Sequence, residues 1–146
     1  MSEFLRQQPT LTLRLAMQAL QSALDKAEEE RVRISVVVVD ASGQPIHSAH
    51  MDMAPRPSRE IALKKALTAV GFGIATQDWQ TRLEKCSEGI RQGLPLQRDI
   101  ALFGGGEPFF HDGQVIGAIG VSGASEAIDG HCAYAAVERV RVLLGC

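Results

Sequence analysis

The sequence predicts an α+β domain with three layers, in which helices flank a central, largely antiparallel sheet of five strands. The expected elements follow in the order helix, two strands, helices, three strands, helix, and short turns join neighbouring strands. The chain lacks the regular alternation of strand and helix that supplies the crossovers of a parallel sheet. Hairpin connections therefore favour antiparallel pairing, with the helices covering the faces of the sheet.

The first part of the chain predicts a helix and a hairpin. Apolar residues recur at helical spacing after Thr10, which we expect to be the N-cap, until the charged segment 28–31. The segment RISVVVVDA (33–41) is apolar at nearly every position, as is typical of a strand covered on both faces, so we place it centrally. A turn at 40–43 then leads into QPIHSAHMD (44–52) as the second strand.

The rest of the chain predicts helices, three strands and a final helix. We expect Ser58 to cap a helix that runs to about Phe72, and TQDWQTRLEKCSEG (76–89) to form a shorter helix followed by a loop. The segment RDIALFG (98–104) is predicted to be a strand. Two more strands follow around a turn at Asp112-Gly113, before a helix from about Ser125 to Leu144.

Composition limits the classes of function. The 146 residues are 45% hydrophobic and 22% charged, which indicates one globular domain at 10–146 behind a short polar leader at 1–9. A net charge of −2 leaves no basic surplus for nucleic acid. The chain shows neither a signal peptide nor an apolar run of membrane-spanning length, so we expect a cytoplasmic protein without membrane contact. The scattered Cys86, Cys132 and Cys146 are expected to be plain thiols.

Glycines are concentrated toward the C-terminal strands. The positions from Gly104 to Gly106, together with Gly117, Gly120 and Gly123, allow two explanations: close packing of a helix, or a ligand lying against the backbone. A phosphate-binding loop is disfavoured because an extended segment, not a helix, follows Gly106. Ser125 is expected to cap the last helix, whose first amides a ligand carboxylate or phosphate could share with it.

Several side chains are candidates for chemistry. His50 and His131 lie in segments that should border the glycine-rich strands, and imidazole can ligate haem iron or carry protons. Lys65 lies in an apolar helix, where its ammonium could either reach a pocket or remain solvated. Arg98 could bind an anion or pair with a neighbour. No Ser-His-Asp order, HExxH or paired-carboxylate motif is present, so these residues alone name no catalytic mechanism.

The combination of motifs resembles the GlcG/HbpS family, which includes the C-terminal domain of PduO-type proteins. The resemblance is carried by VVVVDASGQPIHSAHMDMA, IALKKALTAVGFG and RDIALFGGGEPFFHDGQVIGAIGVSG, and it covers almost the whole chain. It implies a three-layer domain that forms homo-oligomers, with some relatives that bind haem and some linked to haem degradation or corrinoid metabolism. Matched residue by residue, it points to Asp52, Lys65, Arg98 and Asp129, and it places His50 where arginine is common.

Three hypotheses of function follow. The first is a small-ligand-binding protein for haem or a related tetrapyrrole, with His50 or His131 on the iron and with Lys65 and Arg98 on the propionates. The second is a lyase, isomerase or hydrolase acting on a small organic or aromatic acid. In that enzyme Lys65 and Arg98 would hold the acid, the backbone amides near Gly104, Gly105, Gly106 or Gly123 would stabilise developing charge, and His50 or Asp52 would be the base. The third is a structural homo-oligomeric scaffold.

Overall fold

A single antiparallel sheet with the strand order β2-β1-β4-β3 organises the chain. The computed structural model describes residues 2–145. Cys146, which we expected to be a plain thiol, lies outside the described residues. The elements, in chain order, are α1 (Leu13–Glu30), β1 (Ser35–Asp40), β2 (Pro45–His50), α2 (Ser58–Phe72), α3 (Trp79–Glu84), α4 (Glu88–Gly93), β3 (Gly106–His111), β4 (Gln114–Ser122) and α5 (Glu126–Leu144), with short 3-10 turns at Thr76–Asp78 and Leu94–Leu96.

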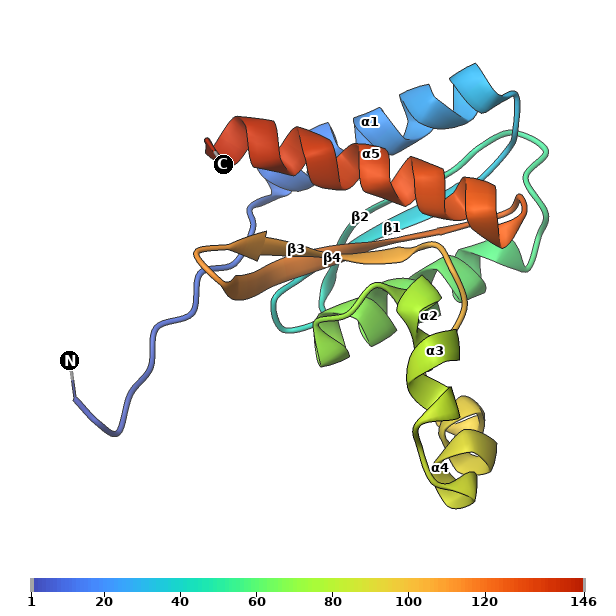
Figure 1. Cartoon of the computed structure of the whole chain (residues 1–146). Helices are drawn as coiled ribbons and strands as arrows, with labels where there is room; N and C mark the ends of the chain where they lie inside the picture. Colours follow the sequence, from blue (N-terminus) through green and yellow to red (C-terminus); the bar gives the residue numbers. More distant parts are fainter. Residues whose placement is uncertain (1, 146) are drawn as a thin grey trace.

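The helices cover the two faces of the sheet unequally. Figure 1 shows α1 and α5 side by side on one face and α2 on the other. The larger core fills the space under α1 and α5 and is dominated by alanine, valine, leucine and isoleucine. The smaller core holds alanines of α2 against valines of β1. The predicted three-layer α+β arrangement is therefore confirmed.

The valine-rich strand occupies the centre, as its pattern predicted. β1 pairs with β2 on one side and with β4 on the other, and five of its six residues are buried. The last hairpin is also confirmed. Asp112 and Gly113 have φ values of 49° and 76° between β3 and β4, the left-handed pair that a tight two-residue turn requires.

The sheet has four strands among the described residues, so the prediction of a fifth at 98–104 is wrong. In this segment a side chain of α2, and not a neighbouring strand, accepts the backbone hydrogen bond. The Ala101 amide donates to Thr68 Oγ1 at 2.9 Å. The same hydroxyl lies 3.2 Å from the Asp99 carbonyl oxygen. Asp99 also adopts a φ of 61°, which breaks an extended conformation. The segment therefore crosses α2 as irregular chain.

Two of the three predicted helix caps, at Thr10 and Ser58, are wrong. Thr12, not Thr10, caps α1 by accepting a hydrogen bond from the Leu15 amide, while the Thr10 hydroxyl accepts from the Ala41 amide. Ser58 lies inside the first turn of α2, whose N-cap is the preceding proline. Ser125 caps α5 as predicted, because its side chain accepts from the Ile128 amide.

The segment between α2 and β3 differs from the single short helix predicted at 76–89. A 3-10 turn leads into α3, which ends at Glu84, and α4 follows where a loop was expected. Figure 1 shows this segment projecting from the body of the domain below α2. Within the described part of the chain, no helix is both long and apolar enough to cross a membrane. Cys132 is a buried free thiol and Cys86 a partly exposed one.

Candidate functional site

Close packing of α2 on the sheet accounts for three of the glycines in the C-terminal strands. A Cβ added to Gly120 would overlap the Ala62 carbonyl oxygen of α2. One added to Gly106 would lie 2.5 Å from the Lys65 carbonyl oxygen, and one added to Gly105 would lie 2.7 Å from the Lys65 ammonium nitrogen. At these positions the chain itself fills the space, as the first of the two explanations, close packing of a helix, requires.

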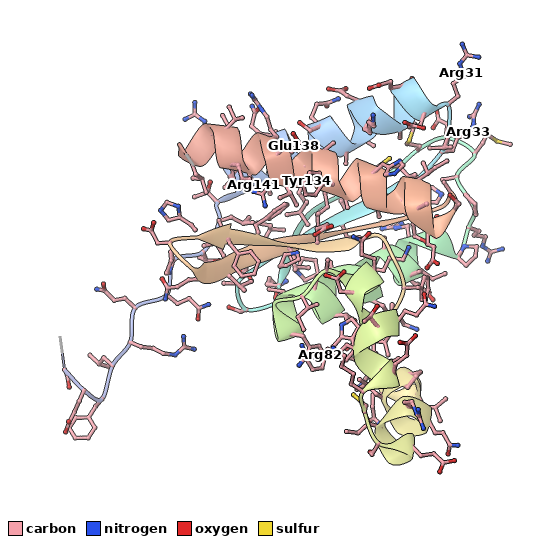
Figure 2. The ribbon with its side chains drawn as sticks, in the orientation of Figure 1. Arg31, Arg33, Arg82, Tyr134, Glu138 and Arg141 are labelled. Atoms are coloured by element: carbon pink, nitrogen blue, oxygen red, sulfur yellow. The ribbon has the colours of Figure 1, made fainter. Side chains whose placement is uncertain are left out.

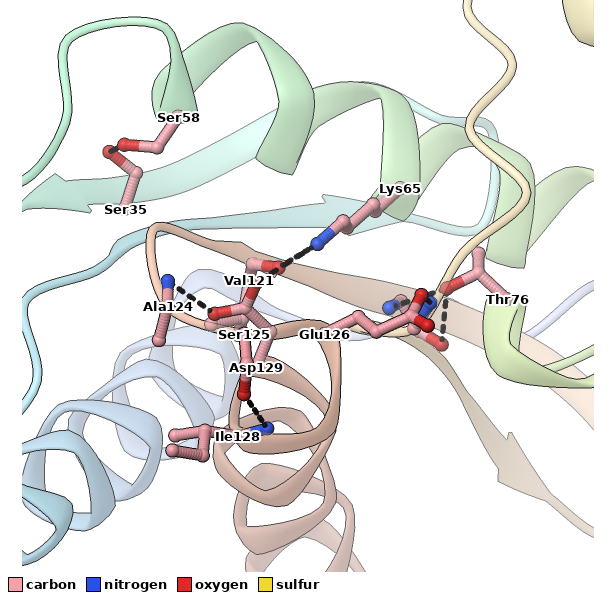
Figure 3. A network of polar contacts seen from close by, with 12 residues as sticks. Ser35, Ser58, Lys65, Thr76, Val121, Ala124, Ser125, Glu126, Ile128 and Asp129 are labelled. Atoms are coloured by element: carbon pink, nitrogen blue, oxygen red, sulfur yellow. Dashed lines mark hydrogen bonds and ion pairs between the residues drawn. The ribbon is translucent and has the colours of Figure 1, made fainter.

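The Lys65 ammonium is held inside the protein. Its side chain is 1% exposed, and Nζ lies 2.8 Å from the Val121 carbonyl oxygen and 3.2 Å from Asp129 Oδ2 (Figure 3). Nζ also lies 4.9 Å from the centre of the Phe103 ring, within cation–π range. The ammonium, which was expected either to reach a pocket or to remain solvated, is therefore directed at the end of β4 and the first turn of α5.

Burial acts on both members of this pair. It lowers the pKa of Lys65, and the Asp129 carboxylate opposes that change. It also raises the pKa of Asp129, opposed by Lys65 and by hydrogen bonds from the Ala124 and Gly123 amides. The Ala124 amide donates to Asp129 Oδ1 at 3.0 Å. An internal carboxylate therefore occupies the amides near Gly123 that were expected to receive the carboxylate of a ligand.

Amides of the triple glycine also have partners within the chain. The Gly104 amide donates to Glu126 Oε2 at 3.2 Å, and the Gly106 amide donates to Thr76 Oγ1 at 2.8 Å. The buried Thr76 contact is visible in Figure 3. Sequence reasoning did not identify Thr76 or Glu126. The only available signal for Thr76 was a small polar residue just after a helix-ending glycine.

His50 stands at the end of β2 with its ring orientation fixed by a neighbour. Its Nδ1 makes a short hydrogen bond with the hydroxyl of the fully buried Ser35 on β1. That hydroxyl also accepts from Ser58 Oγ at 3.1 Å (Figure 3). Because Nδ1 is occupied, Nε2 is the ring nitrogen left for a ligand.

The exposed side of His50 faces a cavity of about 660 Å³ between the end of α1 and the end of β2. Its apolar lining comes from Leu24, Val32, Ala49 and Met51, and its charged lining comes from Glu28, Arg31, Arg33 and Asp52. The lining includes neither Lys65 nor Arg98. Sequence reasoning named His50 and Asp52 but missed both arginines, which stood among other charges with no spacing to mark them.

The two arginines extend from the connection between α1 and β1. Figure 2 shows Arg31 and Arg33 pointing outward there. Arg31 adopts a φ of 58° as the C-cap of α1, which directs the chain back toward the sheet. One guanidinium nitrogen of Arg33 donates to the Asp52 carbonyl oxygen at 2.9 Å, which fixes the loop after β2. The remaining guanidinium donors suit carboxylate or phosphate groups.

His131 faces a different and more acidic cavity of about 570 Å³. Glu30, Glu107 and Glu138 line it, and the one lysine in the lining, Lys26, lies 3.5 Å from Glu30. Burial, with a smaller contribution from Asp78, raises the pKa of Glu107 to about 7. This cavity is therefore poorly suited to an anionic ligand.

The remaining candidates lie apart from both histidines' cavities. Arg98 is exposed after the second 3-10 turn, in the segment that crosses α2. Ser125 is occupied as the cap of α5. Of the residues predicted to form one site, the structure brings His50 and Asp52 together, and separately joins Lys65 to Asp129 and the glycines.

Comparison with known proteins places this geometry in a family. A family model described as haem-degrading, HbpS-like protein matches residues 11–138. Corrinoid adenosyltransferase PduO of Salmonella typhimurium is 32% identical over 125 residues, which are 86% of this chain but only 37% of PduO. The crystal structure of Klebsiella pneumoniae protein ORFY is 33% identical with a TM-score of 0.87, covering 96% of both chains. That of a PduOC:heme complex is 32% identical with a TM-score of 0.81, covering 89% of this chain and 94% of that one.

Proposed function

The chain belongs to the HbpS-like family of haem-degrading proteins, and on this premise we propose that it binds haem or a related tetrapyrrole. The observation that carries the proposal is the His50 imidazole, fixed through Nδ1 by Ser35 and set in the wall of a cavity of about 660 Å³. A metal-ligating histidine ordinarily has its second nitrogen held in this way. The cavity volume is ordinary for a cofactor site.

The lining of this cavity fits the parts of a haem. Imidazole Nε2 of His50 would ligate the iron, while Leu24, Val32 and Met51 offer apolar contact to the ring. Arg31 and Arg33 would hold the propionates by charge-assisted hydrogen bonds. When bound, haem supplies a redox-active iron. The residues of this chain supply its orientation, its charge balance and the imidazole ligand.

The site differs from the one expected for propionates at Lys65 and Arg98. The Lys65 ammonium is neutralised by Asp129 and cannot reach the His50 cavity without breaking that buried pair. The same fact weakens the alternative of an enzyme that holds a small acid between Lys65 and Arg98, because its main cation already has a carboxylate. We therefore favour the binding function with Arg31 and Arg33 as the anion contacts.

Hemin titration of the purified protein, followed by absorption in the Soret region, tests the proposal. We expect a stoichiometric Soret band that shifts in His50→Ala, with an affinity at least about tenfold lower. Arg31→Gln and Arg33→Gln should each lower the affinity about tenfold while the band position stays unchanged.

His131→Ala is the matched control, since His131 is an exposed histidine on a different cavity. It should bind hemin like the unaltered chain. Absence of a Soret band would overturn the proposal. A shift in His131→Ala but not in His50→Ala would overturn the assignment of the ligand.

We also propose that the protein forms homo-oligomers. Apolar side chains on the outer faces of α1 and α5 are well exposed in the single chain, with Met17 at 51% and Val142 at 69%. Exposed apolar side chains on these two neighbouring helices support an interface between subunits. Light scattering coupled to size-exclusion chromatography would detect the assembly, and a monomer at micromolar concentration would contradict it.

A further inference from the structure

A third cavity, of about 460 Å³, lies where the start of α1 meets the C-terminal end of α5 and the β3–β4 hairpin. Its floor is apolar, formed by Leu11, Leu15, Ile116, Leu143 and Leu144. It shares no lining residue with the His50 cavity. The haem proposal therefore leaves this cavity without a role.

The wall formed by the N-terminal segment is fixed to the sheet. The Leu11 amide donates to the Ile116 carbonyl oxygen at 3.0 Å, and the Ala41 amide donates to Thr10 Oγ1 at 2.9 Å. Leu11 itself is 6% exposed and packs on Gly117, where any added Cβ would overlap the leucine side chain. The glycine thus admits the leucine that forms the floor, and the cavity is built into the fold.

The charged side chains around the apolar floor are arginines, and the neutral polar ones are Thr10, Thr12 and Gln18. Arg14 and Arg139 line the cavity from α1 and α5, and the described lining residues include no aspartate or glutamate. One guanidinium nitrogen of Arg139 donates to Gln18 Oε1 at 3.2 Å, which positions the group while leaving its other donors available.

His111 adds an imidazole to the lining of the cavity. It lines the cavity from the end of β3, and its Nδ1 is buried without a hydrogen-bond partner in residues 2–145. Its other ring nitrogen lies 3.5 Å from Asp112 Oδ2 in the turn. The Nδ1 atom is closed off from the cavity, so the imidazole forms part of the wall and does not bind a ligand through that nitrogen.

We propose that this cavity is a second binding site, for a small carboxylate with an apolar body, such as a medium-chain fatty acid. The apolar body lies on the leucines and Ile116, and the carboxylate meets Arg14 and Arg139. An apolar floor supplies affinity by burying hydrocarbon. Guanidinium groups favour a charged carboxylate over a neutral head group. The proposal does not depend on whether haem binds at His50.

Isothermal titration calorimetry with octanoate, 1-octanol and acetate as probes tests the site. Octanoate should bind, 1-octanol should bind at least about tenfold more weakly because it lacks the charge, and acetate should give no measurable heat because it lacks the apolar body. Arg139→Gln and Arg14→Gln should each weaken octanoate about tenfold. Arg82→Gln, an exposed arginine on α3, is the matched control and should leave the affinity unchanged.

Two further variants test whether octanoate occupies this cavity and whether its binding is independent of His50. Leu15→Trp, at a partly buried position of α1 in the cavity lining, fills the cavity and should abolish octanoate binding without loss of the folded circular-dichroism spectrum. His50→Ala should leave octanoate binding intact. Equal binding of octanoate and 1-octanol, or full affinity in the Arg14→Gln/Arg139→Gln double variant, would overturn the proposal. So would loss of octanoate binding in His50→Ala, or its competition by one equivalent of hemin.

Discussion

The Lys65 ammonium lies 3.2 Å from the Asp129 carboxylate, and both side chains are at most 2% exposed. The pair joins α2 to the first turn of α5 across the end of β4, where the ammonium also binds the Val121 carbonyl oxygen. It is therefore the polar link between the helices on opposite faces of the sheet. A buried pair of this kind contributes little beyond a hydrophobic replacement, but losing one partner is costly because the other charge is left unpaired.

Removal of the lysine should be strongly destabilising. Lys65→Met leaves the Asp129 carboxylate buried without its cation, so we expect the free energy of unfolding to fall by about 3–5 kcal/mol. Lys65→Met combined with Asp129→Asn should recover a large part of this loss, because the amide oxygen can still accept from the Ala124 amide. Urea denaturation measures both, with the exposed neighbour Lys64→Met as a control within about 0.5 kcal/mol of the unaltered chain. Equal stability of Lys65→Met and Lys64→Met would contradict the pair's importance.

Gly120→Ala should prevent α2 from packing at its present distance. The new methyl group would overlap the Ala62 carbonyl oxygen, which is backbone and cannot rotate away. We expect a loss of about 3 kcal/mol or more, at the upper end of overpacking effects. Gly71→Ala is the matched control, because its site at the end of α2 has open space. It should be neutral or stabilising by up to about 1 kcal/mol, since alanine is the better helix former. Similar thermal midpoints for the two variants would be inconsistent with this packing.

Stability should fall as the pH rises from about 4.5 to about 7. Burial raises the pKa of Glu107 to about 7 in the folded protein, whereas the unfolded chain has the ordinary value. In this window the native state binds more protons than the unfolded state, so its stabilisation is greatest below pH 4.5 and is lost toward pH 7. Glu107→Gln should remove this contribution and be more stable than the unaltered chain at pH 7.5, by about 3 kcal/mol at most. Urea denaturation at pH 5 and 7.5 measures the difference, and a pH response unchanged by the substitution would refute the assignment to Glu107.

Ser35 should act as a positioning residue for the proposed haem ligand. Its hydroxyl holds His50 Nδ1, so Ser35→Ala should lower hemin affinity about 10–100-fold and broaden or shift the Soret band. Ser35→Thr, which restores a hydroxyl, should recover part of the spectrum. Ser48→Ala, on the exposed part of β2, should change neither affinity nor spectrum. A Ser35→Ala variant that loses stability but keeps the Soret position would show that the hydroxyl has only a structural role.

The sequence predicted those features that depend on periodicity or on turn chemistry. The valine run of β1 indicated a strand covered on both faces, and Asp112-Gly113 indicated the tight turn. Both features were predictable because they depend on residues that are neighbours in the sequence. The segment 98–104 has the composition of a strand, yet the Thr68 hydroxyl of α2 binds the Ala101 amide and the Asp99 carbonyl oxygen. A partner that lies 33 residues away leaves no local signal.

The candidate site was predictable only in part, because some of its residues come from segments that are distant in the sequence. His50 and Asp52 are close in sequence, so their presence on one cavity follows from the end of one strand. Arg31 and Arg33 join them because β1 and β2 pair in the register that places Ser35 opposite His50. That register brings the connection after α1 beside the loop after β2. No spacing within either segment could indicate it.

By itself, the sequence determined the three layers, the central strand and the family, because apolar period and glycine position encode which face of each element is buried. The tertiary structure alone decided that Lys65, and not the adjacent Lys64, is the buried lysine, and that its partner is Asp129. It also decided that this carboxylate occupies the amides at the start of α5. The physical reason is distance: Gly105, Gly106 and Gly120 let the backbone of α2 approach the sheet, and that approach sets which charges can pair across the end of β4.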